Sequence, residues 1–177
     1  MDADPLFRSG HEACRFAYAY NCQQYPMTIM AKMMRGCLLG SGRGLVGLEG
    51  AAVAGTVKRH VESLRGPSPS VIAARYEMDR AKAMPHTVAL VRYVVPALGT
   101  GAHHTHLVRA LVCRYFKITD ASGKQIMLAR LASDFDLSTD TLTRLWVATR
   151  NRLREAQSRA EGEIDGVLVC AGLVAVK

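Results

Sequence analysis

The side chains with the clearest chemical potential in this sequence lie between Ser138 and Arg154. If this segment is a helix, its polar residues share an outward face at 100° per residue. Arg144 and Asn151 on that face suit bidentate hydrogen bonds with guanine and adenine, and threonine and valine suit contacts with thymine methyl groups. We expect these two side chains to contact bases and the neighbouring basic residues to contact phosphates; a solvated helix face is the alternative. The predicted DNA-binding residues are Lys124, Arg130, Ser138, Thr139, Asp140, Thr143, Arg144, Val147, Arg150, Asn151, Arg152 and Arg154.

A second candidate site is a glycine motif near residue 45. Gly42, Gly44 and Gly47 match GxGxxG, the fingerprint in which glycines let the backbone approach a nucleotide phosphate. That fingerprint requires a preceding β-strand, whereas the residues before it, AKMMRGCLL, have a helical pattern. We therefore favour a loop that enters a helix over residues 48–64, with a nucleotide site as the weaker alternative.

A third candidate is the cluster of His103, His104 and His106. Adjacent histidines cannot converge on one ion from a single helix, where ligands are spaced by three or four residues. His103 and His106 have that spacing, but no third ligand is evident nearby. We expect histidines that titrate near neutral pH, with no metal and no cofactor. Since no paired carboxylates, catalytic triad or metal triad emerges either, we expect the protein not to be an enzyme.

The predicted DNA-binding residues need a scaffold, and the segment LARLASDFDLSTDTLTRL supplies a pattern for one. Its apolar residues are spaced for a helix, a three-residue turn and a second helix, the geometry that places a second helix in the DNA major groove. Ser138 suits the N-cap of the second helix, with Asp140 in its first turn. A purely structural hairpin is the alternative. The predicted inward residues are Leu131, Ala132, Phe135, Leu137, Leu142 and Leu145.

Two further helices should support this pair. A helix ending near Phe116 places Leu107, Leu111 and Tyr115 inwards. After Leu145 an apolar stripe continues, so the last helix either extends towards Gly166 or breaks near Gly162. The stripe needs a partner, which is either the N-terminal helices or a second chain in a homodimer. We expect Trp146 to anchor that packing, with stacking on a nucleic-acid base as the less favoured alternative. The stripe consists of Thr149, Leu153, Ala156, Ala160, Ile164 and Val167.

The rest of the chain predicts an all-α fold. Helices are expected over residues 11–20, 48–64 and 70–83, and in a methionine-bearing segment with Met30, Met33, Met34 and Cys37. The segment HTVALVRYVV fits a strand or a helix, and we favour a helix because no second strand is available to pair with it. GPSPS marks a boundary. The predicted regions are an N-terminal helical region (1–66), connecting helices (67–102) and a helix-turn-helix region with a helical extension (103–177).

Composition favours a polyanionic partner and the cytoplasm. The 177 residues carry a formal net charge of +8, and residues 103–159 alone carry ten Lys and Arg against five Asp and Glu. Five scattered cysteines without a CxxC motif indicate reduced thiols. The sequence begins with no signal-peptide pattern, and its longest apolar run, VLVCAGLVAV, is too short to span a bilayer. We expect a soluble cytoplasmic protein without membrane contact.

Residues 128–154, preceded by HLVRALVCRYF, resemble region 4 of bacterial sigma factors, which reads promoter DNA through a helix-turn-helix. This resemblance covers about a third of the chain. It departs in having Asp136 where glycine is common, and in lacking a capping Ser or Thr before Leu128. The end, REAQSRAEGEIDGVL, is similar to the close of phage Q-type late antiterminators. HEACRFAYAYNCQQYP and GSGRGLVGLEGAAVAG are similar to segments of prophage DNA-binding proteins.

The resemblance implies a phage or prophage transcription regulator. Q-type proteins bind DNA beside a late promoter, load onto paused RNA polymerase with its sigma factor, and suppress termination. Some hold zinc through cysteines, but this sequence lacks such a cluster, so metal dependence is not carried over. The alternatives are an operator-binding repressor or activator that leaves elongation unchanged, and a virion or assembly protein that uses its helices for protein contacts.

Overall fold

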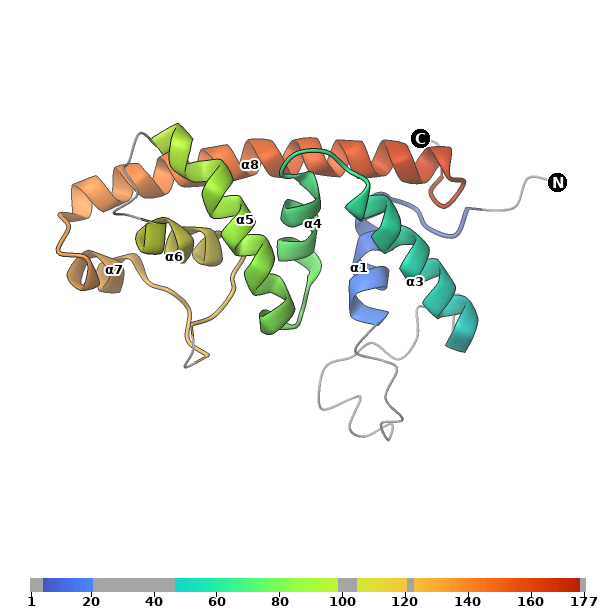
Figure 1. Cartoon of the computed structure of the whole chain (residues 1–177), viewed down its shortest axis with the longest axis horizontal. Coiled ribbons are helices and arrows are strands. Elements are labelled where there is room, and N and C mark those ends of the chain that lie inside the picture. The colour runs from blue at the N-terminus through green and yellow to red at the C-terminus, as the bar shows by residue number, and fades with distance from the viewer. Residues whose placement is uncertain (1–4, 21–46, 99–104, 121–122, 176–177) are drawn as a thin grey trace. The chain divides into compact units, whose positions relative to one another are not determined.

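The computed structural model describes residues 5–20, 47–98, 105–120 and 123–175 (Figure 1). These segments form seven helices and contain no β-sheet, which confirms the predicted all-α class. Within them, each helix is too short or too polar to cross a membrane. The helices are α1 (Gly10–Tyr20), α3 (Gly47–Glu62), α4 (Ser68–Tyr76), α5 (Arg80–Leu98), α6 (Thr105–Tyr115), α7 (Leu128–Asp134) and α8 (Thr139–Cys170).

The chain divides into two compact units. Unit 1 comprises Met1–Leu64 and Glu161–Lys177, and unit 2 comprises Arg65–Ala160. The boundary expected after residue 66 lies two residues from the start of unit 2. The expected region 103–177 is instead shared between the units, because the end of α8 and the tail pack with the N-terminal segment.

Unit 1 joins the two ends of the chain through backbone hydrogen bonds. The Phe7 amide donates to the Leu173 carbonyl at 2.9 Å, and the Ala175 amide donates to the Phe7 carbonyl at 3.1 Å. The Gly10 amide, at the start of α1, donates to Asp165 Oδ1 at 2.6 Å. A carboxylate at a helix N-terminus is favourable because unpaired amides and the helix dipole point towards it.

Helices α1 and α3 pack together within unit 1. The start of α1 carries an S-x-x-E pattern, in which the Glu12 amide donates to Ser9 Oγ at 3.3 Å. Helix α3 buries an apolar seam at Ala54, Val57 and Val61. These contacts confirm the two N-terminal helices expected over residues 11–20 and 48–64.

In unit 2, α5 packs against both α4 and α6 (Figure 1). The ambiguous segment HTVALVRYVV lies inside α5 and is helical, as predicted, with Leu90, Val91 and Val94 buried. The helix expected over residues 70–83 was wrong in its extent, since α4 ends at Tyr76. A new helix begins at Arg80 because Asp79 caps it, its Oδ1 accepting from the Ala81 amide at 2.9 Å.

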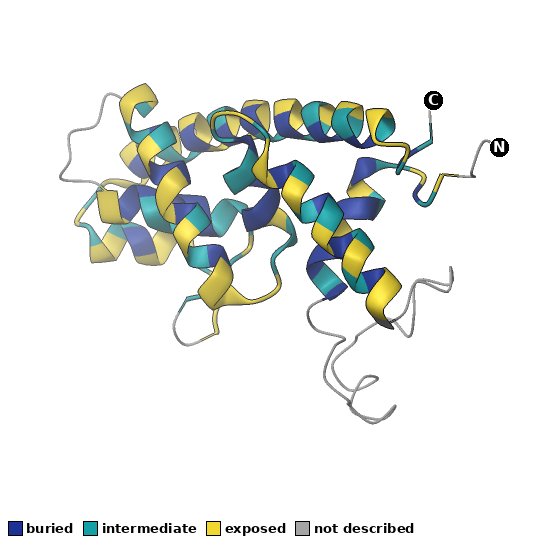
Figure 2. Ribbon diagram, turned by 45° about the vertical axis from the view of Figure 1, so that its right-hand side comes forward, coloured by how far each residue is buried: buried dark blue, intermediate teal, exposed yellow. Residues whose placement is uncertain are grey.

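Helix α8 runs unbroken through Gly162 and Gly166, so the expected alternative of a break near Gly162 is wrong. Figure 2 shows buried and exposed residues alternating along the length of α8. Its buried side is covered by other parts of the same chain. The stripe is buried as predicted except at its last position, where Leu168 replaces the half-buried Val167. The buried residues are Thr149, Leu153, Ala156, Ala160, Ile164 and Leu168.

Several predicted features lie outside the described residues. They are the methionine-bearing segment, Gly42 and Gly44 of the glycine motif, and His103 and His104. Gly47 begins α3, and His106 is exposed on α6. Among the residues that are described, Cys14, Cys113 and Cys170 form no disulfide, and no group of three potential metal ligands occurs.

Candidate nucleic-acid interface

The α7–α8 pair is held by a small apolar core in unit 2. Leu131 of α7 and Leu142 of α8 are buried together with Leu107 and Leu111 of α6. Each fully buried leucine contributes roughly 1.5–3 kcal/mol relative to an exposed one, which holds the short α7 at a fixed angle to the start of α8. The remaining predicted inward residues, together with Trp146, pack around this core. They are Ala132, Phe135, Leu137 and Leu145.

The turn between α7 and α8 explains the aspartate that departs from the sigma-factor pattern. Asp136 has a φ of 49°, in the left-handed region that favours glycine. Asp and Asn are among the few other residues that adopt this conformation routinely. The Leu137 amide then donates to the Ala132 carbonyl at 3.0 Å, which closes the turn. Asp136 therefore meets the backbone requirement that glycine would otherwise meet.

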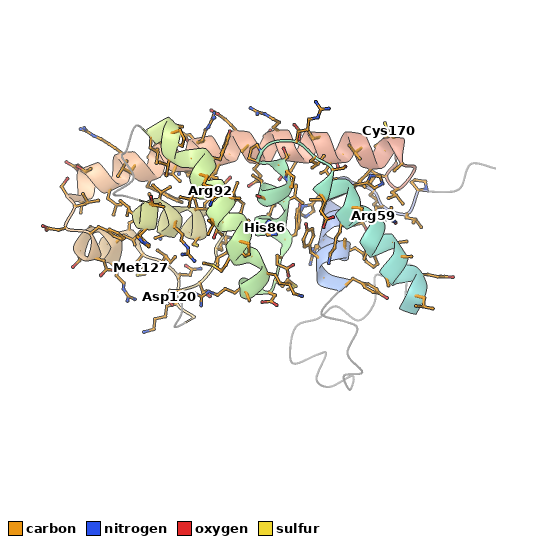
Figure 3. All side chains as sticks on the ribbon, viewed as in Figure 1. Arg59, His86, Arg92, Asp120, Met127 and Cys170 are labelled. Carbon is orange, nitrogen blue, oxygen red and sulfur yellow. The ribbon has the colours of Figure 1, made fainter. Side chains whose placement is uncertain are left out.

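The second helix begins with the predicted cap. Ser138 Oγ accepts a hydrogen bond from the Thr141 amide at 3.2 Å, the contact expected of an N-cap serine. Asp140 follows in the first turn, where a negative charge is favourable. Helix α7 has no side-chain cap before Leu128, as the sequence indicated. Met127 at that position is instead 65% exposed (Figure 3).

One face of α8 near its N-terminus is exposed and carries most of the predicted DNA-binding side chains. Among the described residues, none of Arg144, Arg150 and Arg154 has an acidic side chain within ion-pair distance. Thr143 Oγ1 donates to the Thr139 carbonyl at 2.7 Å, so its hydroxyl proton is used within the helix. The exposed residues are Thr139, Asp140, Thr143, Arg144, Val147, Arg150, Asn151 and Arg154.

Two predicted phosphate contacts differ from the others because they have protein partners. Arg130 Nη1 lies 3.5 Å from Asp120 Oδ2, and Arg130 Nε lies 3.6 Å from Asp134 Oδ2. Arg152 is half-buried, lies 3.7 Å from Glu155, and stacks over a tyrosine ring of α5 at 4.5 Å. Both charges are partly offset inside unit 2. These two arginines are therefore better placed to position neighbouring elements than to bind a phosphate.

The loop between α6 and α7 presents the remaining predicted residue, Lys124, as an exposed side chain. Its backbone amide donates to Asp120 Oδ1 at 2.9 Å, and the Asp120 amide donates to the Lys124 carbonyl at 2.9 Å. Figure 3 labels Asp120 in this loop. These two hydrogen bonds join Asp120 and Lys124, and the lysine side chain remains exposed.

A cavity of about 340 Å³ lies between the end of α6, the following loop and α8. It is lined by Arg114 and Lys117, for which the sequence predicted no role, together with Trp146 and Arg150. The Arg114 guanidinium lies 5.3 Å from the Trp146 ring centroid and donates to the Ile126 carbonyl. The only sequence signal was a pair of basic residues at the end of a predicted helix.

Three side chains in unit 2 have pKa values that are shifted mainly by burial. Burial raises the pKa of the Cys113 thiol and of the Tyr115 phenol, so both remain protonated at neutral pH. The Tyr115 hydroxyl donates to Gln157 Oε1 at 3.0 Å, joining α6 to α8. Burial lowers the pKa of His86, against an opposing effect of Glu77. These shifts indicate structural roles.

In comparisons with known proteins, no family model, no curated protein and no solved structure matches this chain. The function is therefore inferred from the residues and geometry of unit 2.

Proposed function

We propose that unit 2 binds duplex DNA sequence-specifically through the exposed face of α8, and that the protein is a phage or prophage transcription regulator. The observation that carries this proposal is the exposed Arg144 and Asn151 on a helix whose angle to α7 is held by a shared core. A rigid helix presenting side chains suited to guanine and adenine meets the requirements of major-groove recognition.

The charge distribution supports the same proposal. Unit 2 carries 15 Lys and Arg against 7 Asp and Glu, whereas unit 1 carries 8 of each. The whole net charge of +8 therefore belongs to the unit that contains the α7–α8 pair. Clustered positive charge provides the sequence-independent part of DNA affinity by releasing counterions from phosphates.

Within this proposal the side chains have different roles. Arg144 and Asn151 contact base edges, while Arg150, Arg154 and Lys124 contact phosphates on either side. The partnered Arg130 and Arg152 hold the loop and α5 in position. Thr143 and Val147 offer methyl groups to thymine.

The test is selection of preferred sites from a pool of randomised duplexes, followed by Arg144→Ala. We expect the wild type to enrich a defined sequence. The variant should lose about 1–3 kcal/mol at one base position and become tolerant there. Arg92→Ala provides a matched control, since Arg92 is an exposed arginine on α5 of the same unit (Figure 3). It should leave the preference unchanged.

An unchanged sequence preference in Arg144→Ala would remove this residue from base recognition. Near-zero affinity of the wild type for any duplex at low salt would contradict the proposal as a whole. That second outcome would favour the alternative of a virion or assembly protein whose exposed helices contact other proteins.

The resemblance of its last helix to Q-type proteins leads us to propose, more specifically, that the regulator is an antiterminator acting on RNA polymerase. The test combines footprinting at a late promoter with a terminator read-through assay. An antiterminator increases read-through only on templates that carry its site. An operator-binding repressor or activator alters initiation from the same site and leaves read-through unchanged.

A further inference from the structure

The cavity beside α8 combines positive charge with an aromatic side chain. Three cations, Arg114, Lys117 and Arg150, line it, and no Asp or Glu does. Trp146 and two isoleucines supply apolar surface. A site of this composition favours a ligand that joins an anionic group to a flat apolar group.

One of these cations has unused hydrogen-bonding capacity. Arg114 Nε is buried and has no hydrogen-bond partner among the described residues. The same guanidinium is held in place by the Ile126 carbonyl and the Trp146 ring. A buried, unsatisfied donor of a charged group is costly. A small shift of the Arg114 side chain that brings Nε to the cavity surface would let an anion accept a hydrogen bond from it and remove that cost.

The size of the cavity limits the ligand. Its volume of about 340 Å³ lies at the lower end of the range for small-molecule sites, roughly 300–1,000 Å³. A phosphomonoester carries a charge of about −1.5 to −2 at neutral pH and three acceptor oxygens. A single nucleotide therefore matches the cavity in charge, in acceptor number and in its flat aromatic base.

We propose that this cavity binds one nucleotide unit, with its phosphate on Arg114, Lys117 and Arg150 and its base against Trp146. The nucleotide has two sources. It is either a free mononucleotide, which would make the regulator responsive to a small molecule, or a nucleotide of the DNA strand beside α8. In the second case the phosphate is a diester with a single charge, and the base leaves the base stack to reach Trp146. The second source rests on the proposed function, and the first does not.

Trp146 is the only tryptophan of the chain, so its fluorescence reports on this cavity without any label. The purified full chain is titrated with adenosine and guanosine 5′-monophosphate, and separately with the duplex selected above. We expect at least one of these titrations to change the emission in a saturable manner.

Three variants test whether the fluorescence change depends on the side chains that line the cavity. Lys117→Gln removes an exposed cation that lines the cavity, and should weaken the fluorescence-detected binding about ten-fold, the loss expected for one charge-assisted hydrogen bond. Lys82→Gln removes an exposed lysine of α5 that does not line the cavity, and should leave binding unchanged. Arg114→Gln should weaken binding further; if it fails to fold, Lys117→Gln still decides the outcome.

Each outcome has a definite meaning. A response to mononucleotides that depends on Lys117 supports the free ligand, and a response to duplex alone with the same dependence supports the strand. No response, or a response that Lys117→Gln leaves unchanged, overturns the proposal. Duplex binding that depends on Arg144 but not on Lys117 would support the proposed function and overturn the cavity proposal. Mononucleotide binding that depends on Lys117, without affinity for duplex DNA, would support the cavity proposal and contradict the proposed function.

Discussion

The two units differ in how they use charge, although one helix contributes to both. The residues of α8 in unit 2, 139–160, include five arginines and two acids, while residues 161–170 in unit 1 include three acids and no Lys or Arg. In unit 1 the Asp165 carboxylate accepts a hydrogen bond from the Gly10 amide. In unit 2, Arg144 and Arg154 extend from the surface without an acidic partner among the described residues.

This difference indicates that the Asp165 carboxylate helps to maintain the fold of unit 1, whereas the positive surplus of unit 2 is available for a partner. An unpaired surface arginine adds little to stability, since even a formed surface ion pair is worth about 0–1 kcal/mol. A surplus of positive charge on one unit acts instead on association with a polyanion. The following experiments test whether stability and binding separate in this way.

The largest expected effect comes from the apolar core under the α7–α8 pair. Leu142→Ala should lower the free energy of unfolding by about 2–5 kcal/mol, the usual loss for a buried leucine. The matched control is Leu168→Ala, a buried leucine in the part of α8 that belongs to unit 1. Denaturant unfolding should show a similar loss in both variants. At denaturant concentrations where both variants are still folded, only Leu142→Ala should weaken DNA binding. Equal weakening in the two variants would contradict the assignment of DNA binding to unit 2.

Removal of the Asp165 carboxylate in unit 1 should lower the stability of the fold and leave the affinity for DNA unchanged. Asp165→Ala leaves the Gly10 amide without its acceptor, and should cost about 1–2 kcal/mol for a partly exposed charged hydrogen bond. Asp165→Asn keeps an acceptor oxygen, so its loss should be smaller. Thermal unfolding measures both, and gel mobility should show unchanged affinity for duplex DNA. A large loss of affinity in Asp165→Ala would tie unit 1 to the binding surface.

A smaller effect is expected from a single arginine of the exposed face. Arg154→Gln should reduce the slope of log K against log salt by about 0.9, the value for one phosphate contact. The affinity lost between 50 and 200 mM salt should then be about three- to four-fold less. Arg15→Gln, an exposed arginine on α1 of unit 1, should leave the slope unchanged. Equal slopes in the two variants would remove Arg154 from the interface.

The smallest effect concerns pH and unit 2 alone. Burial lowers the pKa of His86 on α5 below its usual 6.5, so the folded state favours the neutral ring (Figure 3). The resulting stability is fully present above pH 6.5 and is lost as the pH falls below that value, because the unfolded chain binds the proton more readily. Unfolding at several pH values should show a weaker acid dependence in His86→Gln. If His86→Gln left the pH dependence of unfolding unchanged, that dependence would arise from other titratable groups.

The sequence predicted the α7–α8 pair well because its contacts are local. Leu131, Leu137 and Leu142 lie within twelve positions of one another, so helical periodicity and one turn place them together. Ser138 was identified from the same local pattern. Two missed features also had local signals: the S-x-x-E pattern at Ser9 marks the start of α1, and Asp79 marks the start of α5.

The cavity beside α8 could not be predicted in the same way. Arg114 and Lys117 lie about thirty positions before Trp146, and nothing in their spacing indicates that they share a site. Their proximity depends on how the end of α6 and the following loop pack on α8. Likewise, nothing in the sequence pairs Arg130 with Asp120, whereas Asp134 lies four residues after Arg130 and has the helical spacing of an ion pair.

The amino-acid sequence by itself determined the all-α class of the described residues, the inward and outward faces of α8, and the cap and turn before it, because these depend on interactions within a few residues. Only the tertiary structure decided that α8 continues through Gly162 and Gly166, and that the N-terminal segment joins the tail through Phe7 and Asp165. Glycine weakens a helix by only about 1 kcal/mol. Burial of Ile164 and Leu168 beside these glycines outweighs that cost, and the burial depends on residues more than a hundred positions away.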